Sequence, residues 1–366
     1  MRALVIGGTG PTGPYIVEGL LKRGYDVTIL HRGTHEVGLP REVEHIHGDP
    51  HFLETLEEAL GPRKFDLVVF TYGRLRLVAQ AMKGRTPRFI AAGGAAYKVR
   101  MLAEAGSLEG CPIPIPEDSP LQLDPNLNPG GFGKFYYMMA ISELEVLKAH
   151  QEGHYNATYL RYPRLYGPRQ LAPREWSMIR RFLDGRRQII VPDNGLKADS
   201  RGYVENMAHA LLLTVDKPDA SAGKSYNVGD EKTFTLREWI VTIARAMNRE
   251  VELVNIPYSV ARPGHAYSWG RYFHEVRDIT AIKKDVGYRD LVSAEEGIRR
   301  TVQWYLENRP EPGGELERQL ADPFDYKAED QLIAEFRECE KRLLQLPFAG
   351  YQRRHPYPHP KKPGES

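Results

Sequence analysis

The segment Gly7–Gly13 decides the fold: it reads Gly-Gly-Thr-Gly-Pro-Thr-Gly and directly follows the short apolar run Ala3–Ile6. It satisfies two glycine spacings at once, Gly-x-x-Gly-x-x-Gly and Gly-x-Gly-x-x-Gly. Such glycines let the chain turn sharply and let its backbone approach a pyrophosphate, which meets the N–H groups at the start of a helix. Because the motif stands between a predicted strand and a predicted helix, it predicts a dinucleotide-binding site.

Short apolar runs alternate with amphipathic stretches through the first third of the chain. The runs predicted to be strands are Ala3–Ile6, Val27–Leu30, Leu67–Phe70 and Phe89–Ala92. Strands this short and this apolar are typical of a parallel sheet covered on both faces. Helical patterns lie between them, one closed by Gly24 and another by Gly61. The alternation predicts an α/β fold, a Rossmann doubly wound parallel sheet with a smaller C-terminal substrate lobe.

The remainder of the chain predicts a second lobe and an extension. We expect a dinucleotide-binding domain over 1–165 with a return around 202–230, a substrate-binding lobe over 166–310, and an extension over 311–366. Further helices are predicted over Lys134–Gln151, Arg174–Leu183, Leu236–Met247 and Ser293–Glu307. The extension starts with a helical apolar stripe between Leu332 and Leu344 and ends in a proline- and histidine-rich stretch, which excludes regular helix there.

Composition excludes several classes of protein. Lys and Arg number 50 against 48 Asp and Glu, so charge does not favour a nucleic-acid partner. The two cysteines, Cys111 and Cys339, exclude a disulfide framework and fit a reducing compartment. The sequence shows neither an N-terminal signal pattern nor an apolar run of about 18 residues. We therefore expect a cytoplasmic protein with no membrane partner and, because the pairs His45/His47 and His355/His359 lack a third ligand, no metal site.

The end of the second predicted strand bears on the choice of nucleotide. Arg32 lies nineteen positions beyond Gly13, where an acid would bind the ribose 2′-OH of NAD, and no acid follows the strand until Glu36. A guanidinium suits the 2′-phosphate of NADP, so NADP is favoured and NAD is the alternative; a solvated surface arginine is the competing interpretation. The predicted cofactor-binding residues are Gly7, Gly8, Thr9, Gly10, Pro11, Thr12, Gly13, His31, Arg32, Asp49 and Thr71.

Beyond the glycine segment, a series of motifs resembles the extended short-chain dehydrogenase/reductase family, in its NAD(P)-dependent sugar epimerase/dehydratase group. The motifs are His47-Gly48-Asp49, Glu117-Asp118-Ser119-Pro120, Tyr159-Leu160-Arg161-Tyr162-Pro163, Arg201-Gly202-Tyr203-Val204 and Tyr226-Asn227-Val228-Gly229. The resemblance extends from Met1 to about Arg309. It implies an NAD(P)-dependent enzyme acting on a small polar or nucleotide-sugar-like molecule.

The same resemblance implies catalytic groups that this sequence replaces. The family pattern has a Ser or Thr after a central strand and a Tyr-x-x-x-Lys pair on the next long helix, where the tyrosine exchanges a proton with the substrate and the lysine lowers its pKa. Matching the motifs puts Gly93 at the first position and Phe135 and Met139 at the pair. We therefore expect the acid/base role to fall on their neighbours, which are Lys134, Tyr136 and Tyr137. The alternative is that these residues only pack in the core or in a subunit interface.

Arginines in the later motifs predict an anionic substrate, because guanidinium forks suit phosphate and carboxylate groups. The resemblance implies that Tyr97, Arg164 and Arg201 bind substrate. The leading hypothesis is an NADP-dependent oxidoreductase or epimerase, an isomerase if the oxidation is transient, that works as a homodimer. The competing hypothesis is a catalytically silent NADP-binding regulatory or scaffold protein.

Overall fold

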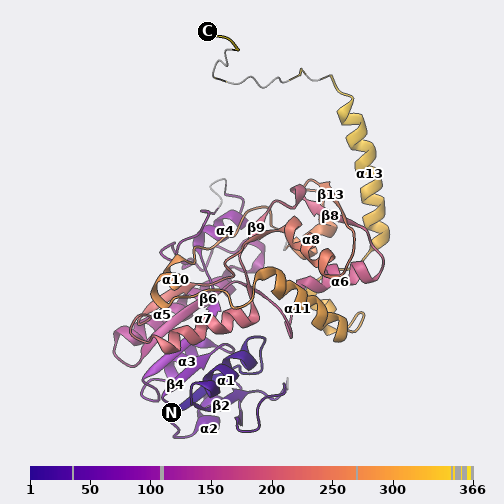
Figure 1. Ribbon diagram of the computed structural model, residues 1–366. Coiled ribbons are helices and arrows are strands. Elements are labelled where there is room, and N and C mark those ends of the chain that lie inside the picture. The colour runs from indigo at the N-terminus through magenta and orange to yellow at the C-terminus, as the bar shows by residue number, and fades with distance from the viewer. Residues whose placement is uncertain are drawn as a thin grey trace. The chain divides into compact units, whose positions relative to one another are not determined.

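The computed structural model describes residues 1–34, 37–107, 111–268, 271–347, 349–350, 356 and 361–363. The chain divides into two compact units, Met1–Phe324 and Asp325–Ser366 (Figure 1). Glu36, His355 and His359, which entered the sequence predictions, lie outside the described residues.

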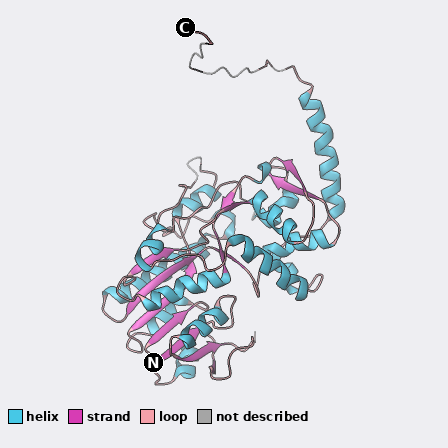
Figure 2. Ribbon diagram, in the orientation of Figure 1, coloured by secondary structure: helices cyan, strands magenta, loops and turns pink. Residues whose placement is uncertain are grey.

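A seven-stranded sheet forms the centre of the first unit (Figure 2). Its strands are β1 (Arg2–Ile6), β2 (Asp26–His31), β3 (Glu44–His47), β4 (Leu67–Phe70), β5 (Arg88–Gly94), β6 (Asn156–Tyr162) and β11 (Lys224–Asn227). They are ordered β11-β6-β5-β4-β1-β2-β3, and every neighbouring pair is parallel. This is the strand order of a doubly wound dinucleotide-binding sheet, so the predicted fold class is confirmed.

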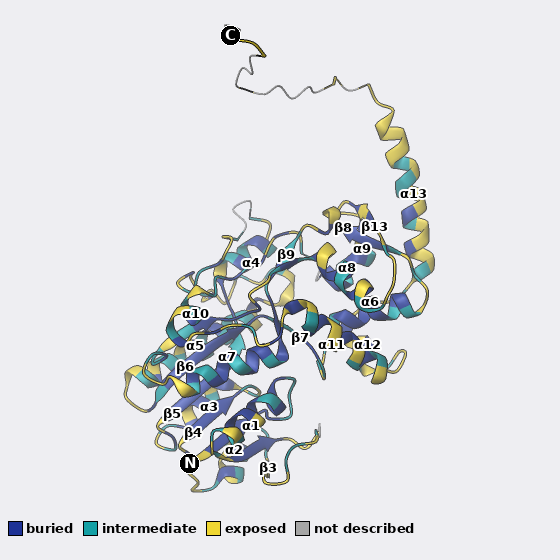
Figure 3. Ribbon diagram, viewed as in Figure 1, coloured by how far each residue is buried: buried dark blue, intermediate teal, exposed yellow. Residues whose placement is uncertain are grey.

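Helices cover both faces of the sheet, because side chains alternate between the two faces along each strand. Ala3 and Val5 face one core and Leu4 and Ile6 face the other. The first core includes side chains of α1 (Gly13–Lys22), α7 (Val204–Asp216) and α10 (Thr280–Val286). The second includes side chains of α2 (Leu53–Leu60), α3 (Leu75–Ala81) and α5 (Gly133–Gln151). Figure 3 shows the resulting buried band of strands.

A separate core, which runs from Tyr166 to Leu320, defines what we call the second lobe. Its helices are α6 (Arg174–Leu183), α8 (Leu236–Ala246), α9 (Arg262–Ser268), α11 (Ala294–Glu307) and α12 (Glu315–Leu320). Its strand pairs are β7 (Arg164–Tyr166) with β10 (Arg201–Tyr203), β8 (Gln188–Pro192) with β13 (Glu252–Ile256), and β9 (Ala198–Asp199) with β12 (Phe234–Thr235). Between these pieces the chain returns to the sheet through α7 and β11.

The remaining short elements are α4 (Lys98–Glu104), η1 (Pro129–Gly131) and η2 (Asp193–Gly195). The second unit contains α13 (Tyr326–Leu344), whose first turn is capped because the Asp325 carboxylate accepts a hydrogen bond from the Ala328 N–H at 3.1 Å. Among the helices that the structure describes, none combines the length and the apolar character that crossing a bilayer requires.

Candidate active site

The turn between β1 and α1 requires glycine at Gly7 and Gly13. Gly7 has φ 97°, a left-handed conformation that glycine adopts without strain. A Cβ on Gly13 would lie 2.1 Å from the Gly8 carbonyl oxygen, so the strand and the helix approach too closely for any side chain. Thr12 precedes the helix without a side-chain hydrogen bond to its first turn. The Gly13 N–H already donates to the Gly10 carbonyl oxygen at 2.9 Å, and Pro14 has no N–H. The start of α1 therefore offers an anion mainly the positive end of its helix dipole.

A cavity of about 660 Å³ opens beside this turn. Eight predicted cofactor residues line it, namely Gly7, Thr9, Gly10, Pro11, Thr12, His31, Arg32 and Thr71. Gly8 and Gly13 shape the turn instead, and Asp49 is not part of the lining. The Asp49 carboxylate accepts hydrogen bonds from the N–H of His51 at 3.0 Å and from its Nδ1 at 2.7 Å.

The end of β2 gives the cavity its charge. Arg32 is exposed, and its guanidinium lies 5.4 Å from the centroid of the Tyr72 ring, which also lines the cavity. The neighbouring His31 accepts a hydrogen bond from the Gly33 N–H at its Nδ1, while its Nε2 lies 3.1 Å from Nδ1 of His45. No Asp or Glu occurs among the described residues that line this cavity, whereas Arg32 and Arg169 do line it.

Nine further residues line the cavity that were not predicted from the sequence to bind the cofactor. They are Gly33, Thr34, Val37, Tyr72, Tyr162, Leu165, Arg169, Leu171 and Trp304. Of the two arginines in this lining, Arg169 comes from the loop that follows β7, two residues after Gly167.

A second group of charges lies buried where the second lobe meets the sheet; we call it the arginine cluster. It comprises Arg100, Arg164, Lys197, Arg201, Arg271 and Arg277 around the carboxylates of Glu104, Asp199 and Glu275. Arg164 lies 2.9 Å from Asp199 and 3.2 Å from Glu275. Although burial alone would raise the pKa of both carboxyl groups, the surrounding guanidiniums hold each pKa well below its usual range. Six cationic side chains thus share three carboxylates.

Arg201 is the least compensated member of the cluster. Its guanidinium lies 4.3 Å from the centroid of the Trp239 ring and 4.0 Å from Asp199. The terminal nitrogen Nη1 of Arg201 has no hydrogen-bond partner among the described residues. Burial lowers the pKa of Arg201 from its usual value. It lines a small cavity of about 20 Å³ together with Arg164, Glu175 and Trp239.

Tyr97, the third predicted substrate residue, is held in a hydrogen-bond network. Its hydroxyl donates to Oδ1 of Asn227 at 2.7 Å and accepts from Arg161 at 2.6 Å, and the side chain is buried. Arg161 also donates to both carboxylate oxygens of Glu143. The structure therefore places the Tyr97 hydroxyl against Arg161 of β6 and Asn227 of β11, and Tyr97 is not part of the lining of the cavity beside the glycine turn.

Comparison with known families adds the decisive observation. The family model described as "NAD dependent epimerase/dehydratase family" matches residues 3–92 and 131–229, which is more than half of the chain. The chain belongs to this family. The matched residues include the glycine turn and the strands that form the cavity.

Known relatives of this epimerase/dehydratase-family chain are distant. The dTDP-glucose 4,6-dehydratase of Neisseria gonorrhoeae is 32% identical over 150 residues, 39% of this chain and 42% of that protein. The chain thus matches less than half the length of that relative. A 3-diazoavenalumate denitrifying reductase of a Streptomyces species is 28% identical over 262 residues, 68% of this chain and 82% of that protein.

A solved protein structure has the same fold as this chain. The dTDP-glucose 4,6-dehydratase of Streptomyces venezuelae, crystallised with NAD bound, superposes with a TM-score of 0.62 at 22% identity. The superposition covers 84% of this chain and 98% of that structure. At this level of identity the likeness establishes the α/β fold alone.

The sequence analysis expects the family's Ser/Thr position at Gly93, on strand β5. A Cβ on Gly93 would lie 2.2 Å from the hydroxyl oxygen of Tyr159, which comes from the neighbouring strand β6. That hydroxyl donates a hydrogen bond to the Gly94 carbonyl oxygen at 3.1 Å. Burial raises the pKa of Tyr159 far above its usual value, so the hydroxyl stays protonated. A buried phenol therefore occupies the space into which a side chain at position 93 would project.

The expected Tyr and Lys positions lie on the first turns of α5. Phe135 is 59% exposed, and its ring meets that of Tyr136 edge-on, with centroids 5.5 Å apart. Met139 packs at the end of β5, since its sulfur would lie 2.8 Å from a Cβ on Gly94. Neither side chain can donate a proton or carry a charge.

The three predicted substitutes lie in different surroundings. Lys134 is exposed, whereas Tyr136 and Tyr137 are half-buried. Arg100 places its guanidinium 4.2 Å from the centroid of the Tyr136 ring, within the range of a cation–π interaction. This contact places Tyr136 at the edge of the arginine cluster. Among the described residues, Lys134 and Tyr137 have no comparable contact.

Proposed function

We propose that this protein is an NADP(H)-dependent oxidoreductase or epimerase/dehydratase-type enzyme that acts on a small polar or nucleotide-sugar-like substrate with a non-standard acid/base set. The observation that carries the proposal is the cavity whose lining contains both the glycine turn before α1 and the exposed Arg32. A glycine turn, the positive end of a helix dipole and a cation suit a phosphorylated dinucleotide. The family's name and the dehydratase and reductase relatives support the same class.

The residues of the cavity divide the work of holding the cofactor. The glycine turn and the first turn of α1 would receive the pyrophosphate, and Arg32 would bind the 2′-phosphate of NADP. The absence of carboxylates from the described lining favours NADP over NAD, because a ribose 2′-OH is usually bound by an acid. When bound, the nicotinamide accepts a hydride from the substrate or returns one.

Tyr136 is the proposed proton donor and acceptor. Its phenolic hydroxyl would exchange a proton with the reacting oxygen of the substrate, as the family tyrosine is expected to do. The Arg100 guanidinium lies 4.2 Å from the centroid of its ring and would hold the ring in place. Lys134 and Tyr137 remain the alternative donors on the same helix.

Arg201 is the proposed ligand of an anionic part of the substrate. A buried guanidinium with a terminal nitrogen that makes no hydrogen bond to the described residues is poised to bind a phosphate or carboxylate oxygen. The six-to-three excess of cations in the arginine cluster favours an anion at this place. Arg164 is already paired with Asp199 and Glu275, so we expect it to orient the residues around Arg201 and not to bind the substrate directly.

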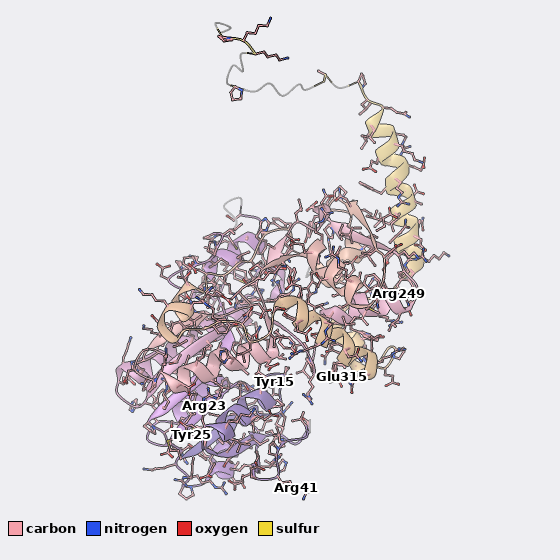
Figure 4. The ribbon with its side chains drawn as sticks, viewed as in Figure 1. Tyr15, Arg23, Tyr25, Arg41, Arg249 and Glu315 are labelled. Atoms are coloured by element: carbon pink, nitrogen blue, oxygen red, sulfur yellow. The ribbon has the colours of Figure 1, made fainter. Side chains whose placement is uncertain are left out.

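The variant Tyr136→Phe tests the proposal. NADP⁺ or NADPH is supplied with a panel of sugar nucleotides, ketones and aldehydes, and turnover is followed by reduced-nicotinamide absorbance and by product mass. Loss of general acid/base catalysis should lower kcat about hundredfold or more, with the NADP dissociation constant unchanged. Tyr25→Phe is the control, because Tyr25 precedes β2 and is not part of the cavity lining (Figure 4). Full activity of Tyr136→Phe would refute this role, and failure of the wild type to retain any nicotinamide nucleotide would refute the proposal as a whole.

A second candidate function is a catalytically silent NADP-binding regulator. It is favoured by the Tyr159 hydroxyl, which fills the space beside Gly93, and by the exposed phenyl ring of Phe135. In that case NADP binds, no substrate of the panel turns over, and a partner protein binds only when NADP is present. Sedimentation of the same sample would test the homodimer that we also propose.

A further inference from the structure

One wall of the cofactor cavity comes from the second lobe. It is formed by Leu165 at β7, by Arg169 and Leu171 in the loop that follows β7, and by Trp304 on α11. The opposite wall comes from the sheet and includes Arg32 and the glycine turn. The cavity is thus enclosed by residues that lie more than 130 positions apart in the sequence.

The loop that carries Arg169 is attached to α11. The Tyr305 hydroxyl, one residue after Trp304, donates a hydrogen bond to the Gln170 carbonyl oxygen at 3.3 Å. The Gln170 side chain donates to the Leu165 carbonyl oxygen at 3.0 Å and so closes the loop on itself. These bonds hold Arg169 and Trp304 together as one wall.

Arg169 adopts an unfavourable backbone conformation in that loop. Its φ is 62°, in the left-handed region that costs a residue with a Cβ about 1 kcal/mol or more. Strain of this kind persists where the surrounding structure imposes it, and it concentrates at ligand sites. Here the conformation accompanies an exposed guanidinium that lines the cavity.

A neighbour on α1 places Arg169 beside the pyrophosphate position. Tyr15 lies in the first turn of α1. Burial raises the pKa of Tyr15, and the guanidiniums of Arg169 and Arg300 are among the groups that oppose this rise. The cavity lining agrees with this, since Arg169 lines the same cavity as Gly10, Pro11 and Thr12, which precede the helix.

We propose that Arg169 binds the cofactor pyrophosphate and that the indole of Trp304 packs against the adenosine half, so that the second lobe takes part in cofactor binding. The inference rests on the proposed function only in that the cavity takes a nicotinamide dinucleotide. Two guanidiniums on opposite walls, Arg32 and Arg169, then bind different phosphates of one molecule. The half-buried indole offers a flat apolar surface of the kind on which bases stack.

The first experiment measures dissociation constants of NAD and NADP by calorimetry. Arg169→Ala should weaken both nucleotides equally, about tenfold, because both carry the pyrophosphate. Arg41→Ala and Arg249→Ala are matched controls: both arginines are exposed, neither lines the cavity, and both project from the surface in Figure 4. An Arg169→Ala variant that binds both nucleotides like the controls would overturn the role of Arg169, as would a loss confined to NADP.

The second experiment uses tryptophan fluorescence. The chain has four tryptophans, and NADP should quench the emission of the wild type. Trp304→Phe should lose most of that quenching and keep its affinity, whereas Trp304→Ala should bind NADP about tenfold more weakly. Undiminished quenching in Trp304→Phe, or full affinity in Trp304→Ala, would overturn the role of Trp304. If the wild type binds no nicotinamide nucleotide, the proposed function fails. If the wild type binds NADP and the Arg169 and Trp304 variants bind it as tightly as the controls do, the proposed function stands and this inference fails.

Discussion

The cofactor cavity and the arginine cluster use the same side chain in opposite ways. In the cavity, Arg32 and Arg169 are exposed and no carboxylate is present among the described lining residues. In the cluster, Arg164 and Arg271 are half-buried and paired with Glu275 at 3.2 and 2.8 Å. The first arrangement leaves guanidiniums available to a ligand, and the second uses them to join β7, β9 and the segment around Glu275. The number of arginines does not distinguish the cavity from the arginine cluster. The position of the carboxylates does.

The largest effect is expected where the cluster loses its central carboxylate. Glu275→Gln leaves Arg100, Arg164, Arg271 and Arg277 with one buried partner fewer, and it should destabilise the protein by about 3–5 kcal/mol. Chemical denaturation near pH 7 measures the change. Glu315→Gln, an exposed position visible in Figure 4, should change stability by less than about 0.5 kcal/mol. Equal stability of Glu275→Gln and the wild type would show that the cluster does not depend on this pairing.

The same variant should alter the acid limb of the stability curve. Because the pKa of Glu275 is held below its usual value of 4.5, its contribution is complete above that pH and is lost as the pH falls further. The wild type should therefore lose more stability than Glu275→Gln between about pH 4.5 and pH 3. A parallel decline in both proteins would contradict the depressed pKa.

The cavity can be damaged without breaking the fold by Gly10→Ala. The added Cβ would lie 3.4 Å from its nearest protein neighbour, the Gly7 carbonyl oxygen, which is an ordinary contact. The methyl group would, however, stand where the pyrophosphate is expected to approach the backbone. Affinity for NAD and NADP should fall together by about a hundredfold, on the order of 3 kcal/mol, while the melting temperature stays unchanged. Retained affinity would argue that the nucleotide lies elsewhere.

A narrower change distinguishes the two nucleotides. Arg32→Ala should weaken NADP by about tenfold to thirtyfold, roughly 2 kcal/mol, through loss of a charged hydrogen bond to the 2′-phosphate. NAD binding should stay the same, because NAD lacks that phosphate. Arg41→Ala serves again as the control. If Arg32→Ala binds both nucleotides as tightly as the wild type, Arg32 is a surface residue and the preference for NADP is unsupported.

The smallest effect concerns a carboxyl group at the margin of the cluster. Burial raises the pKa of Glu175 from 4.5 to about 7, even though Arg201 and Arg174 act to lower it. A raised pKa contributes stability below pH 4.5 and loses it as the pH rises through about 7. The wild type should lose about 1 kcal/mol more than Glu175→Gln between roughly pH 6 and pH 8. Identical pH profiles in denaturant titrations would show that Glu175 is already ionised at pH 6.

The fold was predictable because its signals are local. The glycine segment directly joins a short apolar run to an amphipathic helix, and α6 begins and ends at the predicted residues, Arg174 and Leu183. The predicted helix from Lys134 differs from α5 by one residue at its start. In such places the periodicity of the sequence and the packing of the structure impose the same pattern.

The site was predictable only in part, because much of it is assembled from distant segments. The glycine turn and Arg32 follow from the order of strand, turn and helix. Arg169 and Trp304 line the same cavity as the glycine turn because the fold brings α11 and the loop after β7 to it, and no local sequence pattern predicts such a contact. Likewise, the pairing of Glu275 with Arg164 joins residues 111 positions apart.

The hydroxyl of Tyr159 beside Gly93 has a consequence for engineering. Gly93→Ser would place its Cβ 2.2 Å from that oxygen and 3.0 Å from the ring carbon that bears it. Such a variant should fold poorly before any chemistry is tested. Introducing a hydroxyl group at position 93 therefore requires a smaller side chain at position 159 as well, so the two positions constrain each other's mutational routes.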